Sequence, residues 1–463
     1  MKMAEYSRRR TIAVRVGNTA IGGDNPIRVQ SMTTTQTMDT DGCIEQAIRI
    51  INAGGELVRF TAQGTREALN LQNIRDGLRK RGYDTPLVAD IHFNPAVADV
   101  AATIVEKVRI NPGNYVDPAR TFRNLEYSDE EYKAEIGKIR RRLIPFLEIC
   151  REHGTAIRIG VNHGSLSDRI MSRYGNTPAG MVESCMEFLR ICVEQDFMNV
   201  VISIKASNTC VMIETVRLLV RQMEKEGMAF PLHLGVTEAG SDMEGRIKSA
   251  VGIGALLAEG IGDTIRVSLS EAPEREIPVA RKLVAYAAQS AEIRAHAAEL
   301  TDNDGTLHLS YCETSLEDLQ LKAAMDAGAL LIDGKARNLA ISNSGNGISQ
   351  EDIDNTTDAI LQAARIRFTR PEYISCPGCG RTLYNLEETI ARVKAATKHL
   401  KGVRIAIMGC IVNGPGEMAD ADFGYVGAGR GRISLYRGKE CIEKNIPEEQ
   451  AVEHLLALID NSR

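Results

Sequence analysis

Short apolar runs alternate with amphipathic segments along the first 290 residues of the chain. The runs are rich in β-branched residues, as strands are, and the segments between them carry apolar residues at spacings of three and four, as helices do. Eight such runs occur, at residues 26–32, 56–62, 86–93, 107–113, 156–162, 199–207, 231–240 and 263–270. Eight strand-then-helix units over about 250 residues predict a TIM (β/α)8 barrel.

A doubly wound open sheet would also alternate strands with helices. That fold usually has fewer strands and a glycine-rich turn directly after the first one. No such turn follows "VQSM" at residues 29–32, so the pattern favours the barrel.

The predicted strands carry polar side chains in their later halves, where active sites of TIM barrels lie. These side chains are Arg59, Asp90, His92, Arg109, Asn111, Arg158, Asn162, Lys205, Ser207, Glu238, Arg266 and Ser268. Five of them are cations, and like charges that converge on one rim repel unless an anion lies among them. Guanidinium and ammonium groups suit phosphate oxygens, so we expect a small ligand that carries two phosphates. Asp90 and Glu238 could orient hydroxyls or move protons, and Asp90 could equally pair with the arginines.

The pattern changes after residue 290. Residues 291–371 predict a linker, a strand at "GTLHLSYCE", a helix at "SLEDLQLKAAMDAG", a second strand at "ALLIDGKARNLAISN" and a helix near 349–368. This segment is too short to close a second barrel. Residues 372–463 predict a separate α+β domain, in which the glycine-rich "GYVGAGRGR" (424–432) is interpreted as a loop.

Composition is that of an ordinary globular protein, with 43% hydrophobic residues, 25% charged residues and a net charge of −5. No basic field points to nucleic acid, and no apolar run is long enough for a membrane helix. The start "MKMAEYSRRR" lacks the apolar segment of a signal peptide, so we expect a cytoplasmic protein.

The chain has ten cysteines, and three in the C-terminal domain stand apart. Cys376 and Cys379 form a C-x-x-C pair in "CPGCGR", and Cys410 follows an apolar strand before "IVNGPGE". Three thiolates suit an iron–sulfur cluster with one distinct corner, for which Glu417 is a candidate ligand. A structural zinc site stays open as an alternative, with Cys441 or the weaker candidate His399 as fourth ligand. The other cysteines are interpreted as buried free thiols.

Several motifs resemble those of the 4-hydroxy-3-methylbut-2-enyl diphosphate synthases, which serve the methylerythritol phosphate route to isoprenoids. "CPGCGR" and "GCIVNGPGE" resemble the cluster motifs of this family, and "VQSMTTTQTMDT", "VADIHF", "RINPGN", "RIGVNHGSL", "LGVTEAG" and "EGIGDTIRVSLS" resemble its barrel motifs. The similarity covers residues 20–290 and 365–440.

The resemblance implies a [4Fe–4S] oxidoreductase that reductively opens 2-C-methyl-D-erythritol 2,4-cyclodiphosphate and releases water. It implies Cys376, Cys379, Cys410 and Glu417 as cluster ligands, and Glu238 near the reacting carbons. The residues implied at the diphosphate site are Arg59, Arg109, Arg158, Asn162, Lys205, Ser207, Arg266 and Ser268. Reduced ferredoxin or flavodoxin would supply the electrons.

The segment 291–371 resembles a reduced version of the domain that longer members of the family insert at this place. The sequence therefore leaves open whether one chain or a homodimer completes the active site. Two other classes of function also stay open: a non-redox barrel lyase or transferase with a structural zinc tail, and a binding scaffold with an iron–sulfur sensor.

Overall fold

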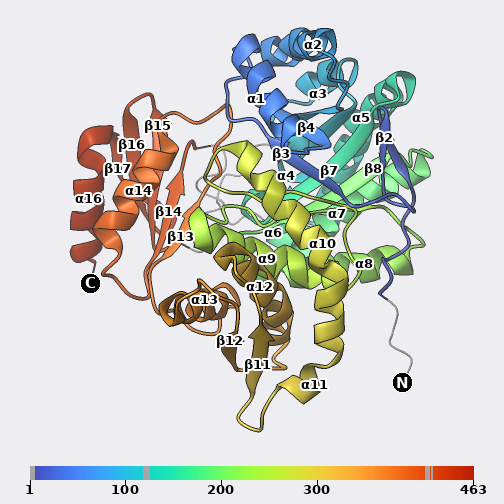
Figure 1. Ribbon diagram of the computed structural model, residues 1–463. Coiled ribbons are helices and arrows are strands. Elements are labelled where there is room, and N and C mark those ends of the chain that lie inside the picture. The colour runs from blue at the N-terminus through green and yellow to red at the C-terminus, as the bar shows by residue number, and fades with distance from the viewer. Residues whose placement is uncertain (1–5, 118–125, 412–417, 419–420, 463) are drawn as a thin grey trace.

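The computed structural model describes residues 6–117, 126–411, 418 and 421–462. Figure 1 shows three parts: the barrel at the upper right, a C-terminal domain in orange and red at the left, and a small α/β segment in yellow and brown below. The C-terminal domain lies beside one end of the barrel, and the small segment packs on the outer helices of the barrel.

Eight parallel strands close into a barrel, which confirms the predicted TIM-barrel architecture. They follow one another around the barrel in chain order, with β10 closing against β3. The strands are β3 (Arg28–Met32), β4 (Leu57–Ala62), β5 (Leu87–Ile91), β6 (Lys107–Ile110), β7 (Ala156–Asn162), β8 (Val200–Lys205), β9 (Leu232–Leu234) and β10 (Thr264–Ile265). Their carboxyl ends therefore share one rim, as the argument from the polar side chains requires.

Helices cover the barrel from outside. The main ones are α1 (Thr40–Asn52), α2 (Thr65–Lys80), α3 (Pro95–Ala102), α5 (Asp129–His153), α7 (Pro178–Glu194), α8 (Thr209–Lys225), α9 (Asp242–Ala258) and α10 (Glu276–Ala295), with the shorter α4 (Pro112–Tyr115) and α6 (Asp168–Tyr174). Many begin where the sequence offers an N-cap: Asn94 and Asn208 accept hydrogen bonds from the first-turn amides of α3 and α8. Such caps determine the residue at which each strand–helix loop ends and its helix begins. They therefore fix the positions of the loops at the barrel rim.

A short hairpin closes the far end of the barrel. Its strands β1 (Val14–Val16) and β2 (Thr19–Ile21) bury Val14, Val16 and Ile21 against Leu57 and Val88. This hairpin was not predicted from the sequence, because three-residue strands are too short to show a clear alternation of apolar and polar residues.

The middle of the barrel is more polar than in most TIM barrels, whose interiors are filled by branched apolar residues. Gln30 donates to Thr264 Oγ1 at 2.8 Å and lies 3.1 Å from His233 Nδ1. Lys107 is fully buried on β6, and its Nζ has no hydrogen-bond partner among the described residues. The barrel interior below the mouth therefore contains a buried positive charge that no described acceptor offsets.

The segment after α10 contains the short helix α11 (Ala297–Leu300), the parallel strands β11 (Thr306–Tyr311) and β12 (Asn338–Asn343), and the helices α12 (Leu316–Ile332) and α13 (Gln350–Ala363). The prediction that a strand begins at "ALLID" was wrong. Those residues prolong α12, because its buried face packs on α9 and needs them. Glycines make this contact close: a Cβ on Gly328 would lie 3.0 Å from Val251, and one on Gly254 would lie 2.4 Å from Met325.

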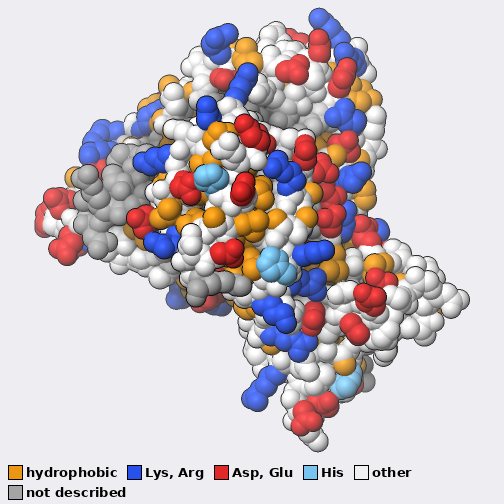
Figure 2. All heavy atoms as spheres, turned by 90° about the vertical axis from the view of Figure 1, so that its left-hand side faces the viewer, with side chains coloured by type: hydrophobic (Ala, Val, Ile, Leu, Met, Phe, Trp, Pro, Cys, Tyr) orange, Lys and Arg blue, Asp and Glu red, His pale blue; other side chains and the backbone are white. Residues whose placement is uncertain are grey.

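The C-terminal domain is a five-stranded sheet in the order β13 (Glu372–Ser375), β14 (Arg404–Met408), β15 (Phe423–Gly429), β16 (Arg432–Arg437) and β17 (Glu440–Pro447). The first three strands are parallel and the last two antiparallel, with α14 (Leu386–Thr397) and α16 (Glu448–Asp460) packed on one face. The interpretation of residues 424–432 as a loop was wrong, since most of them form the β15–β16 hairpin, whose glycines fit against Gly409 and Met418. On the face of the molecule in Figure 2, charges of both signs alternate with apolar side chains.

Across the described residues, none of the helices combines the length and the apolar character needed to cross a bilayer. Of the cysteines interpreted as buried, Cys43, Cys150, Cys185 and Cys192 are buried, Cys210 is half-buried, and Cys312 is exposed at the end of β11.

We expect Gly328→Leu to destabilise the protein by about 1–3 kcal/mol, because the added side chain must push α12 away from α9. The matched control is Gly137→Leu in α5, where a Cβ would meet only Arg141 Nη1 at 3.5 Å. Urea unfolding of both variants checks this. An equal loss of stability in the two variants would contradict the close helix contact.

Candidate active site

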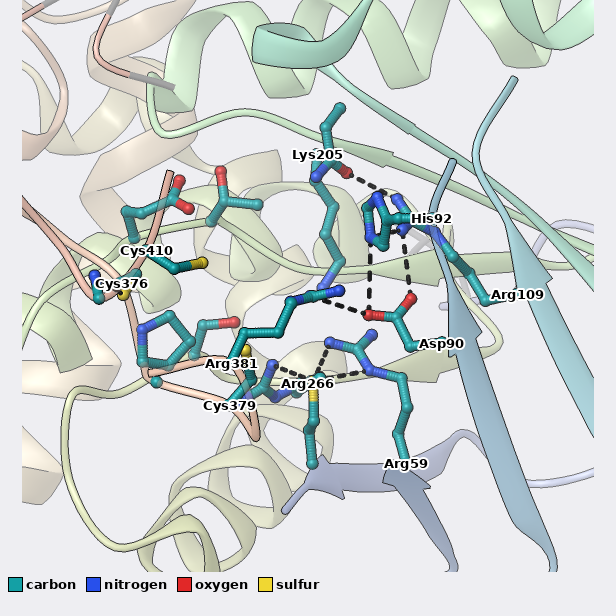
Figure 3. A pocket seen from close by; sticks show the side chains of 18 of the residues that line it. Arg59, Asp90, His92, Arg109, Lys205, Arg266, Cys376, Cys379, Arg381 and Cys410 are labelled. Atoms are coloured by element: carbon teal, nitrogen blue, oxygen red, sulfur yellow. Dashed lines mark hydrogen bonds and ion pairs between the residues drawn. The ribbon is translucent and has the colours of Figure 1, made fainter. Parts of the chain in front are cut away.

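A cavity lies between the barrel mouth and the C-terminal domain, with about 790 Å³ of empty space that includes its opening to solvent. Figure 3 shows side chains from both parts pointing into it. Of the residues predicted from the sequence, the cavity is lined by Arg59, Asp90, His92, Arg109, Arg158, Asn162, Lys205, Glu238, Arg266, Ser268, Cys376, Cys379 and Cys410. All of these come from one chain, so no second copy is needed to bring the cysteines to the barrel mouth.

Two predicted residues do not line the cavity. Asn111 caps α4 by accepting from the Gly113 amide at 3.1 Å, and its side-chain amide donates to Ser165 at 2.8 Å, so it holds a rim loop in place. Ser207 is buried just before α8. Glu417, predicted as the fourth cluster ligand, lies outside the described residues.

The cations at the mouth are buried and crowd one another. Burial, together with Arg59 and Arg158, lowers the pKa of Lys205 well below its usual value. Burial, together with Arg59 and Arg109, does the same to the pKa of Arg158, whose Nε and Nη1 have no partner in the described part of the chain. Glycines make room for this crowding: Gly235 lies against Lys205 Nζ, and Gly160 lies against Arg109 Nε. Such a group of cations is relieved by a bound anion.

Arg59 shows the shortage of anionic partners directly. Its Nε and Nη2 donate to the sulfur of Met32 at 3.0 and 2.7 Å, and burial lowers its pKa to about 10. A thioether is a weak acceptor, whereas guanidinium groups favour carboxylate or phosphate oxygens. Two strong donors of Arg59 thus face a poor acceptor, the Met32 sulfur, which a phosphate oxygen can replace.

Asp90 is the carboxylate at the centre of the cation group. Arg109 Nη1 lies 3.2 Å from its Oδ1, and His92 Nε2 and Arg381 Nη2 lie 3.7 Å from its Oδ2. Burial opposes ionisation, yet Arg109 and Arg59 hold the pKa of Asp90 well below its usual value. Burial and Arg109 lower the pKa of His92 to about 3, so its ring is neutral at pH 7. Both alternatives for Asp90 remain compatible with this geometry, since it pairs with the arginines and also faces the cavity.

Arg266 differs from the other mouth cations because it has a dedicated carboxylate. Its Nε and Nη2 donate to Glu276 at 2.9 and 2.8 Å, and both side chains are almost fully buried. The sequence did not predict this pair, because Glu276 begins α10 and lies outside the strand pattern. Arg266 therefore contributes less free positive charge than Arg158 or Lys205.

Glu238 lies at the contact between barrel and C-terminal domain. Its φ of 48° is in the left-handed region that a residue with a side chain adopts at a cost, and such positions concentrate at functional sites. The next residue, Ala239, pairs with Ser375 in an isolated parallel bridge, so Cys376 follows directly. Ser270 adds a hydroxyl bond to the Cys376 carbonyl oxygen at 3.0 Å. These contacts thus hold the start of the loop that carries Cys376 and Cys379 (the thiol loop) against the barrel.

The thiols of Cys376, Cys379 and Cys410 lie on two loops at the carboxyl ends of β13 and β14. The Gly409 amide donates to Cys376 Sγ at 3.2 Å, a bond that suits a thiolate. Burial raises the pKa of Cys376 to about 12, and metal binding would remove its proton. Among the described residues, no three His, Cys, Asp or Glu side chains converge on one point as ligands of a single metal ion do. The ligands of a four-iron cube sit at separate corners, which three thiols from two loops around one cavity can supply.

Cys441 and His399, the candidate zinc ligands, do not line the cavity. Cys441 lies on β17, where its thiol donates to Glu443 O at 3.6 Å, and His399 is exposed after α14.

Arg381 is a cavity residue that the sequence analysis missed. It follows Cys379 and Gly380 in "CPGCGR", and its position in that motif was the available indication. Burial would lower its pKa, but Cys379, Asp90 and Cys410 raise it above the usual value, so the side chain is a permanent cation.

Comparison with known proteins matches both halves of this site. Residues 11–281 match the family model described as the GcpE TIM-barrel domain, and residues 372–461 match the GcpE protein C-terminal domain. A 4-hydroxy-3-methylbut-2-en-1-yl diphosphate synthase (flavodoxin) of Phocaeicola vulgatus is 53% identical over 99% of this chain and 98% of its own length. The chain belongs to the GcpE family. Enzymes of the same name from Bacteroides thetaiotaomicron and Akkermansia muciniphila are 51% and 41% identical over 100% and 98% of this chain, and over 99% and 96% of their own lengths.

This GcpE chain is shorter than its relatives. The alignment with the Phocaeicola vulgatus protein runs over 606 positions, whereas the chain has 463 residues. The relatives therefore contain a stretch with no counterpart here.

We expect Arg266→Met to lower the free energy of unfolding by about 3 kcal/mol or more, because it leaves Glu276 buried without its cation. Lys205→Met removes a buried cation from like neighbours, so the free protein should keep its stability or gain some. Urea unfolding of the ligand-free protein measures both. Equal losses in the two variants would show that Lys205 has a stabilising partner of its own.

Proposed function

We propose that this chain catalyses the reductive ring opening of 2-C-methyl-D-erythritol 2,4-cyclodiphosphate to 4-hydroxy-3-methylbut-2-enyl diphosphate. One observation carries the proposal: a single cavity is lined on one side by crowded barrel cations and on the other by three thiols of the same chain. The first side suits a diphosphate, and the second suits an iron–sulfur cluster. The names and full-length identity of the bacterial relatives support the same reaction.

The barrel cations bind and orient the substrate. Arg59, Arg158 and Lys205 take the phosphate oxygens, since no carboxylate of the described residues forms an ion pair with any of them. Asn162 and Ser268 line the same wall and add neutral donors. Charge-assisted bonds from several strands fix the ring in one orientation against the thiol loops.

The reaction takes in two electrons and two protons. It breaks one carbon–oxygen bond to phosphate, releases a hydroxyl group as water and leaves a carbon–carbon double bond. Cys376, Cys379 and Cys410, with Glu417 as the proposed fourth ligand, would hold a [4Fe–4S] cluster, which would supply single electrons and a Lewis-acidic iron. Glu238, at the domain contact, would hold or move a proton at the departing hydroxyl. Neutral His92 can donate a hydrogen bond without adding charge.

Reduced flavodoxin is the proposed electron donor, as the relatives' names include it, with ferredoxin as the alternative. The barrel binds the substrate, the C-terminal domain holds the cluster, and the segment 291–371 supports the barrel helices on which it packs. A homodimer is not required for this arrangement, and the cytoplasmic location remains a prediction from the sequence.

Protein purified without oxygen should contain about four iron and four sulfide per chain and lose its brown colour on reduction. Cys410→Ser should lose most of this iron, whereas the control Cys441→Ser should keep it, because Cys441 does not line the cavity. Iron and sulfide analysis checks both variants. A colourless wild-type protein with one zinc would support the non-redox lyase instead.

Lys205→Met should weaken binding of the cyclodiphosphate by about tenfold or more, the effect of losing one charge-assisted hydrogen bond. Calorimetric titration of the holoenzyme measures this. Lys138→Met, on the exposed surface of α5, is the control that should bind as the wild type does. Unchanged binding in Lys205→Met would contradict a diphosphate site among these cations.

A further inference from the structure

The loop that carries Cys379 and Arg381 is pressed into the barrel mouth. A Cβ on Gly380 would lie 2.8 Å from Thr61 Oγ1 and 2.9 Å from the Thr35 carbonyl oxygen. On the other side, the Cys379 amide donates to Thr382 Oγ1 at 3.0 Å. The backbone around Arg381 therefore has little freedom, and its direction into the mouth is fixed by packing.

The guanidinium of Arg381 reaches from the loop of the C-terminal domain to a carboxylate of the barrel. Its Nη2 is 3.7 Å from Asp90 Oδ2, and the side chain lines the same cavity wall as Cys376, Cys379 and Cys410. Figure 3 shows the side chain reaching from the thiol loop toward Asp90. The residue is 8% exposed, so water screens these charges weakly.

Other contacts join the domains away from the thiols. Lys394 Nζ on α14 lies 2.8 Å from Glu244 Oε2 on α9, and Lys248 on α9 pairs with Glu372 at 3.0 Å. Neither of these lysines lines the cavity between the barrel mouth and the thiols. Arg381 differs from them because it lies in the cavity, two residues after Cys379 and beside the carboxylate of Asp90.

We propose that Arg381 is a positioning residue that offsets the negative charge gained by the cluster on reduction and fixes the thiol loop to the Asp90 side of the substrate cavity. The role rests on the proposed [4Fe–4S] function. Hydrogen bonds to the sulfurs of a cluster raise its reduction potential, and a buried permanent cation acts in the same direction. Because the Arg381 guanidinium also lies beside Asp90, Arg381 links the loop that carries Cys379 to the barrel mouth.

The test is a redox titration of the anaerobic holoenzyme, followed by absorbance and electron paramagnetic resonance, after iron and sulfide have been counted. Arg381→Gln should keep its iron and shift the midpoint potential to a more negative value. Arg381→Lys should restore part of the shift, since it returns the charge without the planar fork. Lys394→Gln, which removes an interdomain pair outside the cavity, should titrate as the wild type does.

An unchanged midpoint in an iron-replete Arg381→Gln protein would overturn the proposal. If that variant holds too little iron, Asp90→Asn decides the matter. Removal of the carboxylate leaves the guanidinium charge uncompensated and should make the midpoint less negative, so an unchanged midpoint there would also overturn it. A wild-type protein without iron and sulfide would instead refute the proposed function, and the iron count distinguishes that failure from the others.

Discussion

Crowding of buried cations is the constraint on which the rest of this structure depends. Arg59, Arg109, Arg158 and Lys205 lie within strands β4, β6, β7 and β8, so the closed barrel forces them together whatever else they contact. One carboxylate, Asp90, lies at their centre, and it is shared with His92 and with Arg381 of the other domain. This charge arrangement lowers the stability of the folded protein without a ligand. In return, binding of a polyanion at the site is favourable, because it offsets the repulsion between the cations.

The C-terminal domain completes the site from the other side. Its sheet ends in two thiol loops, and the Ala239–Ser375 bridge and the Ser270 hydroxyl bind the first of them to the barrel. The barrel cations and the three thiols therefore line one cavity within one chain. The small segment between the two domains contributes no residue to the cavity lining. It packs on α9, the helix that begins shortly after Glu238, and so supports the barrel wall from behind.

Much of this architecture could be predicted from the sequence, because strand count and rim position follow from periodicity. Thirteen of the residues predicted for the site line the cavity. What periodicity could not predict depends on three-dimensional pairing. Glu276 opens a helix yet neutralises Arg266, and Asn111 has the right place on the rim but turns away to cap a helix. "GYVGAGRGR" is richer in glycine than a typical strand because Gly424 fits against the Met418 side chain and Gly427 against the Gly409 carbonyl oxygen. Arg381 lies in a loop, where no periodic pattern applies.

The contact between Arg59 and the Met32 sulfur has a further consequence for an enzyme that handles reactive electrons. Oxidants convert a thioether to a sulfoxide, whose oxygen is a far better hydrogen-bond acceptor. A sulfoxide at Met32 would present that oxygen to the two guanidinium donors that now face sulfur at 3.0 and 2.7 Å. The damaged side chain would then imitate a phosphate oxygen and compete with the substrate from inside the site. Exposure to oxygen would thus block substrate binding at the barrel mouth independently of any loss of iron. Methionine sulfoxide reductases would reverse this oxidation.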